Sequence, residues 1–296
     1  MKKLILFITV LTTIGCQSHI HKDEIIKCKD DVEIGTFIEL DGDSFKVVDR
    51  TMLIEMINNN KDITHICTSK VTNMSQLFFN SKFNGKDRDI SNWDVSNVTD
   101  MSKMFYNSEF NGDISNWDVS NVTNMSNMFS NSEFNGDISN WDVRNVTDMS
   151  YMFVSSPFNG DISNWDVSNV TDMSFMFDTT QRIWMEQDIS NWDVSNVTDM
   201  SFMFHKSNFR GKDVDNISNW DVSNVTNMSN MFSNSGFNGD ISNWDVSNVT
   251  DMSYMFVFSP FYEDISNWDV SNVTNMSNMF NEELLLTRCQ KCPKFK

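Results

Sequence analysis

A 24-residue segment recurs along this chain and constrains its fold more than any other feature. Residues 113–129 read DISNWDVSNVTNMSNMF, and seven further copies differ from this one by few letters. The copies are spaced 24, 24, 24, 27, 28, 24 and 24 residues apart when aligned on Trp93, Trp117, Trp141, Trp165, Trp192, Trp220, Trp244 and Trp268. A unit this short cannot bury its large apolar side chains alone, whereas stacked units share one core. The period therefore predicts a solenoid.

An earlier stretch extends the array by one copy. Residues 62–78, DITHICTSKVTNMSQLF, fit the same template, with Ile66 in place of Trp and Leu77 in place of Met. Terminal repeats of solenoids are often atypical. We therefore expect nine coils over residues 62–280, of which the first is degenerate.

Each coil is expected to contain one short strand and one helical turn. Trp117 and Val119 alternate as in a very short strand. The apolar residues from Val122 to Phe129 are spaced 3, 3 and 1, which suits a helical turn packed on one face. The expected fold class is an α/β repeat, a leucine-rich-repeat-like solenoid of short parallel strands and helical turns. The Trp and Met-x-x-Met-Phe stripes are expected in its core.

The segments on either side of the array read as its ends. Residues 34–61 are expected to form an α+β N-terminal cap, in which residues 36–48 make a hairpin turning at Asp41-Gly42. Residues 49–60 read as a helix capped by Asp49. Its apolar face is Met52, Leu53, Met56 and Ile57. Residues 281–296 leave the repeat and are expected to form a tail or a second cap.

The first residues carry a secretion signal. MKKLILFITVLTTIGC has a positive start and an apolar run too short to span a bilayer, so residues 1–15 read as a signal peptide. Thr13-Ile14-Gly15-Cys16 resembles the bacterial lipobox, although Leu is usual where Thr13 stands. The resemblance implies a lipidated Cys16. Residues 17–33 are polar and charged and lack the repeat, so residues 16–33 are expected to be the lipidated Cys and a short tether. The alternative is an ordinary secreted protein cut nearby.

The repeat itself resembles a known family. Ile-x-x-Trp-x-Val followed by Val-Thr-x-Met-x-x-Met-Phe is similar to the BspA-like leucine-rich-repeat surface proteins of bacteria, over roughly residues 34–280. The resemblance implies a lipid-anchored protein of the bacterial cell surface or outer membrane. Some members of that family act as adhesins, so it implies binding to an extracellular protein or glycan.

Charge and residue types exclude other classes of function. The chain has 41 acidic and 22 basic residues and a formal net charge of −19, which argues against nucleic acid as a partner. Only four histidines are present, and none lies in a motif with a nucleophile or with metal-ligand spacing. We therefore expect no enzyme.

Four cysteines besides Cys16 leave their chemistry open. Cys28, Cys67, Cys289 and Cys292 are compatible with disulfides in an oxidising exterior, but their pairing cannot be read from the sequence. Cys289-x-x-Cys292 is half of a zinc ribbon without its other half. Free thiols are the third alternative.

Two columns of acidic residues run along the array. The aspartate column is expected on its outer face and comprises Asp94, Asp118, Asp142, Asp166, Asp193, Asp221, Asp245 and Asp269. The turn column comprises Asp89, Asp113, Asp137, Asp161, Asp188, Asp240 and Asp264, with Asn216 interrupting it. Carboxylates one strand apart repel by about 3 kcal/mol at an effective dielectric constant near 20. Counter-ions such as weakly bound calcium, water, raised pKa values or Asn and Ser donors are candidates for relieving this. A solvated acidic face is the simplest reading.

Two insertions break the lattice in adjacent coils. Residues 178–187 and 205–216 lengthen their turns and carry Arg182, Trp184, Lys206, Arg210 and Lys212. Loops inserted in neighbouring repeats usually emerge on one side of a solenoid and often carry recognition. The sequence therefore favours a binding or adhesion module. The alternative is a structural surface spacer with no specific ligand, for which uniform repeats suffice.

Overall fold

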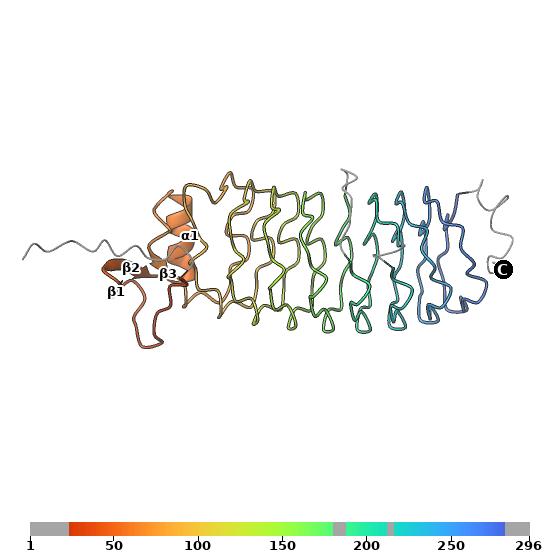
Figure 1. Cartoon of the computed structure of the whole chain (residues 1–296), viewed down its shortest axis with the longest axis horizontal. Coiled ribbons are helices and arrows are strands. Elements are labelled where there is room, and N and C mark those ends of the chain that lie inside the picture. The colour runs from red at the N-terminus through yellow and green to blue at the C-terminus, as the bar shows by residue number, and fades with distance from the viewer. Residues whose placement is uncertain (1–23, 180–187, 212–215, 282–296) are drawn as a thin grey trace, which may run out of the picture.

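The repeats stack in a single row behind a small N-terminal cap (Figure 1). The structure is a computed structural model that describes residues 24–179, 188–211 and 216–281. Each coil lies against the next, from the cap at one end to the last coil at the other (Figure 1). We number the coils 1 to 9 in chain order, beginning with the degenerate copy at residue 62.

The cap has the hairpin and the helix that the sequence predicts. Strands β1 (Phe37–Leu40) and β2 (Asp43–Val47) pair antiparallel, and β3 (Ile66–Cys67) joins β2 in parallel. The turn residues Asp41 and Gly42 both have positive φ, as tight hairpins prefer. Helix α1 (Arg50–Asn58) begins after Asp49, whose side chain accepts the Met52 N–H at 2.8 Å.

Helix α1 covers the apolar side of coil 1. Leu53 is fully buried, and Met52, Met56 and Ile57 pack against the core of the array. Arg50 reaches the backbone of coil 1, where its guanidinium donates to the carbonyl oxygens of Asn73 and Ser75, both at 2.8 Å. The cap therefore closes both the hydrophobic core and the hydrogen-bonding edge at this end.

The described part of the expected tether, residues 24–33, does not extend away from the domain. Ile26 is 3% exposed, and its N–H donates to the Asn92 carbonyl at 2.9 Å. Cys28 forms a disulfide with Cys67 in β3, and Lys70 donates to the Asp30 carbonyl. The prediction of a tether was wrong for these residues. Ile26 and Cys28 stand among polar residues, so the sequence gives no pattern that indicates their packing.

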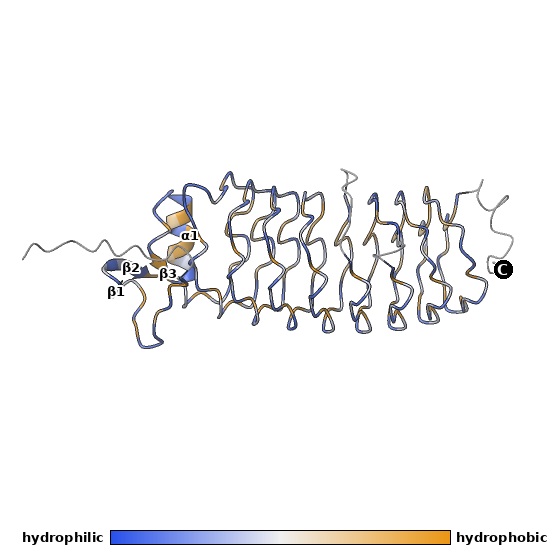
Figure 2. Ribbon diagram, viewed as in Figure 1, coloured by the Kyte–Doolittle hydropathy of each residue, from blue (hydrophilic) through white to orange (hydrophobic). Residues whose placement is uncertain are grey.

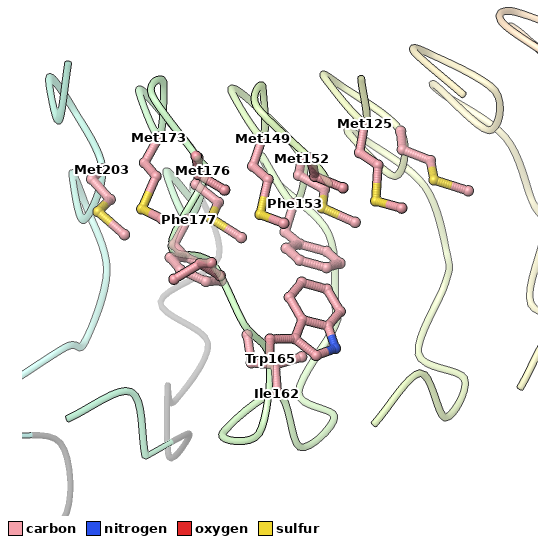
Figure 3. Packing of buried hydrophobic residues seen from close by; sticks show 14 of the residues in the cluster. Met125, Met149, Met152, Phe153, Ile162, Trp165, Met173, Met176, Phe177 and Met203 are labelled. Atoms are coloured by element: carbon pink, nitrogen blue, oxygen red, sulfur yellow. The ribbon is translucent and has the colours of Figure 1, made fainter. Parts of the chain in front are cut away.

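The core is made of the same side chains in every coil, as the sequence predicts. Each repeat Trp is at most 5% exposed, and the Trp117 indole N–H donates to the Ile90 carbonyl of the preceding coil at 3.1 Å. The Phe of each Met-Phe pair stacks on its counterpart in the next coil, with ring centroids 5.4 to 5.9 Å apart. Figure 3 shows the Met side chains in rows beside Phe153, Phe177 and Trp165.

The expected strand is present in coil 1, as β3, but it is absent from the described residues of coils 2 to 9. Residues 114–117 form a turn closed by the Trp117 N–H and the Ile114 carbonyl, which lie 3.2 Å apart. The coils instead pair through isolated parallel bridges farther along the repeat. This bridge position is Asn73, Asp100, Asn124, Asp148, Asp172, Asp199, Asn227, Asp251 and Asn275 in coils 1 to 9. Trp117 and Val119 alternate because the turn places both inward.

The expected helical turn is also wrong, because two β-turns occupy that stretch. In coil 3 the Met128 N–H donates to the Met125 carbonyl, and the Ser132 N–H donates to that of Phe129. The third residue of each turn, Asn127 or Asn131, has φ near +55°. A β-turn with positive φ at this position favours Gly or Asn. Two turns produce the same 3, 3, 1 spacing of apolar residues as a helix.

These turns connect the coils through their alternate N–H groups. Met125, Asn127, Phe129 and Asn131 donate to carbonyls of coil 4 at 2.7 to 3.0 Å. Hydrophilic and hydrophobic residues alternate along the coils (Figure 2). The apolar side chains lie in the core, and the backbone bonds to the neighbouring coil. Every such bond runs from one coil to the next coil in the sequence.

Arg50→Met should destabilise coil 1 while keeping the apolar stem of the side chain. A hydrogen bond to a charged group contributes about 1.5–3 kcal/mol, and two carbonyls would lose their donor. We expect faster amide exchange in residues 74–80, little change in coil 7, and a free energy of unfolding of the N-terminal coils lower by about 2–3 kcal/mol. Arg144→Met, which removes only an exposed ion pair with Asp142, is the control. Equal effects of the two substitutions would contradict the role of Arg50.

Candidate functional site

The aspartate column is exposed as expected except at its first member. Asp118, Asp166, Asp193, Asp221, Asp245 and Asp269 are exposed, and Asp142 is half-buried beside Arg144. Asp94 is only 3% exposed, and it accepts a hydrogen bond from the buried Ser69 hydroxyl. The prediction was wrong for Asp94 because the chain from Ile26 to Cys28 crosses this face of coils 1 and 2.

Serine donors hold the carboxylates of both acidic columns. In coil 3 the Asp118 Oδ1 accepts the Ser120 N–H at 3.2 Å and the Ser120 hydroxyl at 2.6 Å. In the turn column the Asp137 Oδ1 accepts the Ser139 N–H at 2.9 Å. Such Asx turns fold the backbone locally, so these aspartates have a structural role. Within the described residues, no group of three or more His, Cys, Asp or Glu side chains could hold a metal ion.

The same serines lower the pKa of the aspartates. The Ser168 hydroxyl and then its N–H lower the pKa of Asp166, and Ser247 acts in the same order on Asp245. In the turn column the Ser139 N–H and then its hydroxyl lower the pKa of Asp137. The sequence suggests several ways to relieve the repulsion between neighbouring aspartates of a column. Among the described residues, the structure contains one of them, the hydrogen bonds that serines donate to the carboxylates.

The starts of the two insertions meet. Asp178 begins the first insertion and His205 begins the second, and their side chains hydrogen-bond at 3.0 Å between Oδ1 and Nδ1. Lys206 and Arg210 are exposed on the second insertion. Arg182, Trp184 and Lys212 lie outside the described residues, as do Cys16, Cys289 and Cys292.

A row of surface aromatic rings lies beside this junction. The Tyr151 and Phe175 rings stack with centroids 4.3 Å apart and an interplanar angle of 9°, and Phe175 and Phe202 stack at 4.2 Å and 7°. The His205 ring meets the Phe202 ring edge-on at 5.3 Å. Tyr151 is 36% exposed, and the two phenylalanines are half-buried. We call Tyr151, Phe175 and Phe202 the aromatic row.

The aromatic row occupies a backbone position that disfavours bulky residues. Its members have φ between +56° and +59°. They share one place in their coils, the third residue of the first turn, which we call the outward position. In coils 1 to 9 it is Gln76, Lys103, Asn127, Tyr151, Phe175, Phe202, Asn230, Tyr254 and Asn278. Left-handed backbone costs most L-residues about 1–2 kcal/mol, and Asn tolerates it better. Three consecutive coils therefore hold aromatic residues where the turn alone would favour Asn.

Carboxylates flank the aromatic row. Burial and then the negative charges of Asp172, Asp199 and Asp178 raise the pKa of the Tyr151 hydroxyl. Asp172 and Asp199 are bridge residues, each three positions before an aromatic residue of the row. The surface around the row is therefore both apolar and strongly negative.

Sequence reasoning did not single out the aromatic row. It located the insertions through the tryptophan spacing but treated Met-Ser-x-Met-Phe as uniform. The signal was present at the variable letter between the two methionines, which is Asn at 127, 230 and 278 and aromatic at 151, 175 and 202. The left-handed conformation of that residue could not be predicted, because the apolar spacing of the stretch indicates a helical turn, in which φ is negative.

No helix in the described part of the chain has both the length and the apolar character needed to cross a membrane. This finding concerns residues 24–179, 188–211 and 216–281 only.

The stacked coils make this chain a repeat protein, and its sequence matches one family over most of its length. The matches to DUF285, described as "Mycoplasma protein of unknown function", cover residues 49–157, 131–213 and 206–289. The chain therefore belongs to the DUF285 family. No curated protein and no solved structure matches it. The family description gives no function.

Acid should weaken the array through its aspartates. A carboxyl group whose pKa is lower in the folded chain stabilises the fold above its unfolded-state pKa, about 3.9. That stabilisation is lost as the pH falls through the folded-state value. We expect a melting temperature that is nearly constant between about pH 5 and 7 and falls below about pH 4. The fall should be smaller when Asp137, Asp161 and Asp240 become Asn, the residue found at position 216. Identical pH profiles of variant and parent would contradict this account.

Proposed function

We propose that this chain is a lipid-anchored protein of the bacterial cell surface and acts as a binding or adhesion module for an extracellular protein or glycan. Its solenoid is a rigid support, and recognition takes place on coils 4 to 6. The proposal includes no catalytic step and no nucleic-acid partner. The lipid at Cys16 holds the protein to its membrane.

The aromatic row carries this proposal. Its three rings stack on the surface, where core packing does not require them. They stand in left-handed backbone where coils 3, 7 and 9 have Asn, and strained positions of this kind concentrate at functional sites. The row also adjoins the Asp178–His205 contact, so it lies beside the starts of the two insertions.

The regular part of the surface favours a structural spacer as the second candidate. The acidic columns are occupied by Asx turns that shape the backbone and need no ligand. The two candidates differ in one consequence: a spacer tolerates replacement of the aromatic row by the residue of regular coils, whereas a binding module does not.

Changing Tyr151, Phe175 and Phe202 together to Asn should reduce adherence at least tenfold without unfolding the array. Asn suits the left-handed backbone and already occupies this position at Asn127, Asn230 and Asn278, so the melting temperature should stay within a few degrees of the parent. Adherence of bacteria that display each variant to host cells or to an immobilised extracellular matrix is the measurement. The control is Tyr254→Asn, the same change at the equivalent position outside the row. Full adherence of a folded triple variant would favour the spacer.

The anchor has a separate test. Cys16→Ala removes the thiol that would be acylated, so the protein should leave the membrane fraction or remain unprocessed. Its incorporation of labelled fatty acid should fall to background. A Cys28→Ser and Cys67→Ser variant is the control, because it removes cysteines without touching the lipobox. Unchanged fractionation and unchanged labelling of Cys16→Ala would rule out the lipoprotein assignment.

A further inference from the structure

Acidic and aromatic residues occur together in the same coils. In coils 4, 5, 6 and 8 the bridge position is Asp and the outward position three residues later is aromatic. These pairs are Asp148 with Tyr151, Asp172 with Phe175, Asp199 with Phe202, and Asp251 with Tyr254. Where the outward position is Asn, in coils 3, 7 and 9, the bridge position is Asn too. Coil 2 has Asp100 with Lys103, and coil 1 has Asn73 with Gln76. Every aromatic outward residue therefore has an aspartate three positions before it, whereas no Asn outward residue does.

The turn itself does not require this charge. The Asn124 Oδ1 accepts the Ser126 N–H at 2.9 Å, just as the Asp148 Oδ1 accepts the Ser150 N–H at 2.9 Å. An Asn at the bridge position thus folds the turn as an Asp does. A carboxylate at this position needs another explanation.

Asp172 also lies in an unusual place along the bridge column. Elsewhere an Asn of a neighbouring coil donates to the aspartate: Asn73 to Asp100 at 2.9 Å, Asn227 to Asp199 at 3.0 Å and Asn275 to Asp251 at 2.9 Å. The backbone of Asp172 forms parallel β-bridges with Asp148 of the preceding coil and with Asp199 of the following coil. The three carboxylates follow one another beside the aromatic row with no amide between them, so their mutual repulsion favours a cation.

The rings determine what kind of cation fits. Phe175 stacks on Tyr151 at 4.3 Å and on Phe202 at 4.2 Å, so both of its faces are occupied, as is one face of each end ring. The row therefore presents mainly ring edges to a ligand. Ring edges suit an aliphatic chain, whereas a sugar ring packs on an exposed aromatic face. Lys and Arg side chains combine an aliphatic stem with a charged end, and Arg pairs well with carboxylates. The acidic chain would also attract such a ligand over a distance.

We infer that the aromatic row and the bridge residues Asp148, Asp172 and Asp199 form a docking surface for a basic segment of a partner polypeptide. Aliphatic stems of its Lys or Arg side chains lie along the ring edges, and their charged ends reach the carboxylates. This inference rests on the proposed binding function and narrows its ligand to a cationic protein.

Peptide binding to the full chain tests the inference at about 0.15 M salt, where distant charges are screened. The probe is a fluorescent hexapeptide of alternating Lys and Leu, and its counterpart has Glu in place of Lys. The Lys peptide should bind and the Glu peptide should not. Asp148→Asn with Asp172→Asn should weaken binding about tenfold, and Phe175→Asn should weaken it as well.

The matched control removes two charges elsewhere. Asp137→Asn with Asp161→Asn alters exposed aspartates of the turn column and should change the dissociation constant less than twofold, although the net charge changes equally. An equal loss in the two double variants would reduce the effect to net charge and overturn the inference. Failure of the Lys peptide to bind, or equal binding of the Glu peptide, would overturn it too.

Adherence assays separate this inference from the proposed function. If the aromatic triple variant loses adherence and the Asp148, Asp172 double variant loses it as well, both stand. If only the aromatic variant loses adherence, the binding function stands and the cationic partner is wrong. If neither loses adherence, both proposals fail.

Discussion

The backbone hydrogen bonds between consecutive coils are the interaction on which the rest of this structure depends. Alternate N–H groups of each double turn donate to the next coil, and the remaining ones close the turns themselves. This division places left-handed residues at two positions in coils 1 to 4 and 6 to 8, and Asn is the commonest residue there. The backbone is thereby satisfied without long strands, and the side chains are free to form the core.

The core follows from this arrangement of the backbone. Because every coil is held in the same register by its neighbour, equivalent side chains meet, and Phe stacks on Phe and Trp follows Trp. Identical side chains in equivalent places give identical contacts at each step. The repetition of surface aspartates and serines has the same origin, since each Asx turn bends the backbone of its own coil. Much of the uniform surface is therefore part of how the chain folds.

The features that the sequence predicts correctly depend on local patterns and on the repeat. The hairpin at Asp41-Gly42 and the cap of α1 at Asp49 can be predicted from neighbouring residues, and the buried Trp and Met stripes from their recurrence in every unit. The strand was wrong for coils 2 to 9 because a turn places Trp and Val inward at the spacing of a strand. The helical turn was wrong because two successive β-turns place apolar residues at the spacing of a helix. The burial of Asp94 depends on a segment far away in the sequence, which no local pattern reveals. The aromatic row could be predicted only in part. The change from Asn to aromatic residues is present in the sequence, but the stacking of the rings depends on the register of the coils.

The direction of the hydrogen bonds makes the two ends of the row chemically different. The first coil presents carbonyl groups, which Arg50 of the cap occupies, whereas every later coil receives donors from the coil before it. A coil removed from the middle, with its whole length of chain, leaves the same donors facing the same acceptors. A deletion within a double turn would put donors opposite the wrong groups, whereas the spacings of 27 and 28 residues leave the double-turn bonds of their coils in place. Whole coils can therefore be gained or lost in evolution. Such a change alters the length of the array and leaves the core contacts between coils the same.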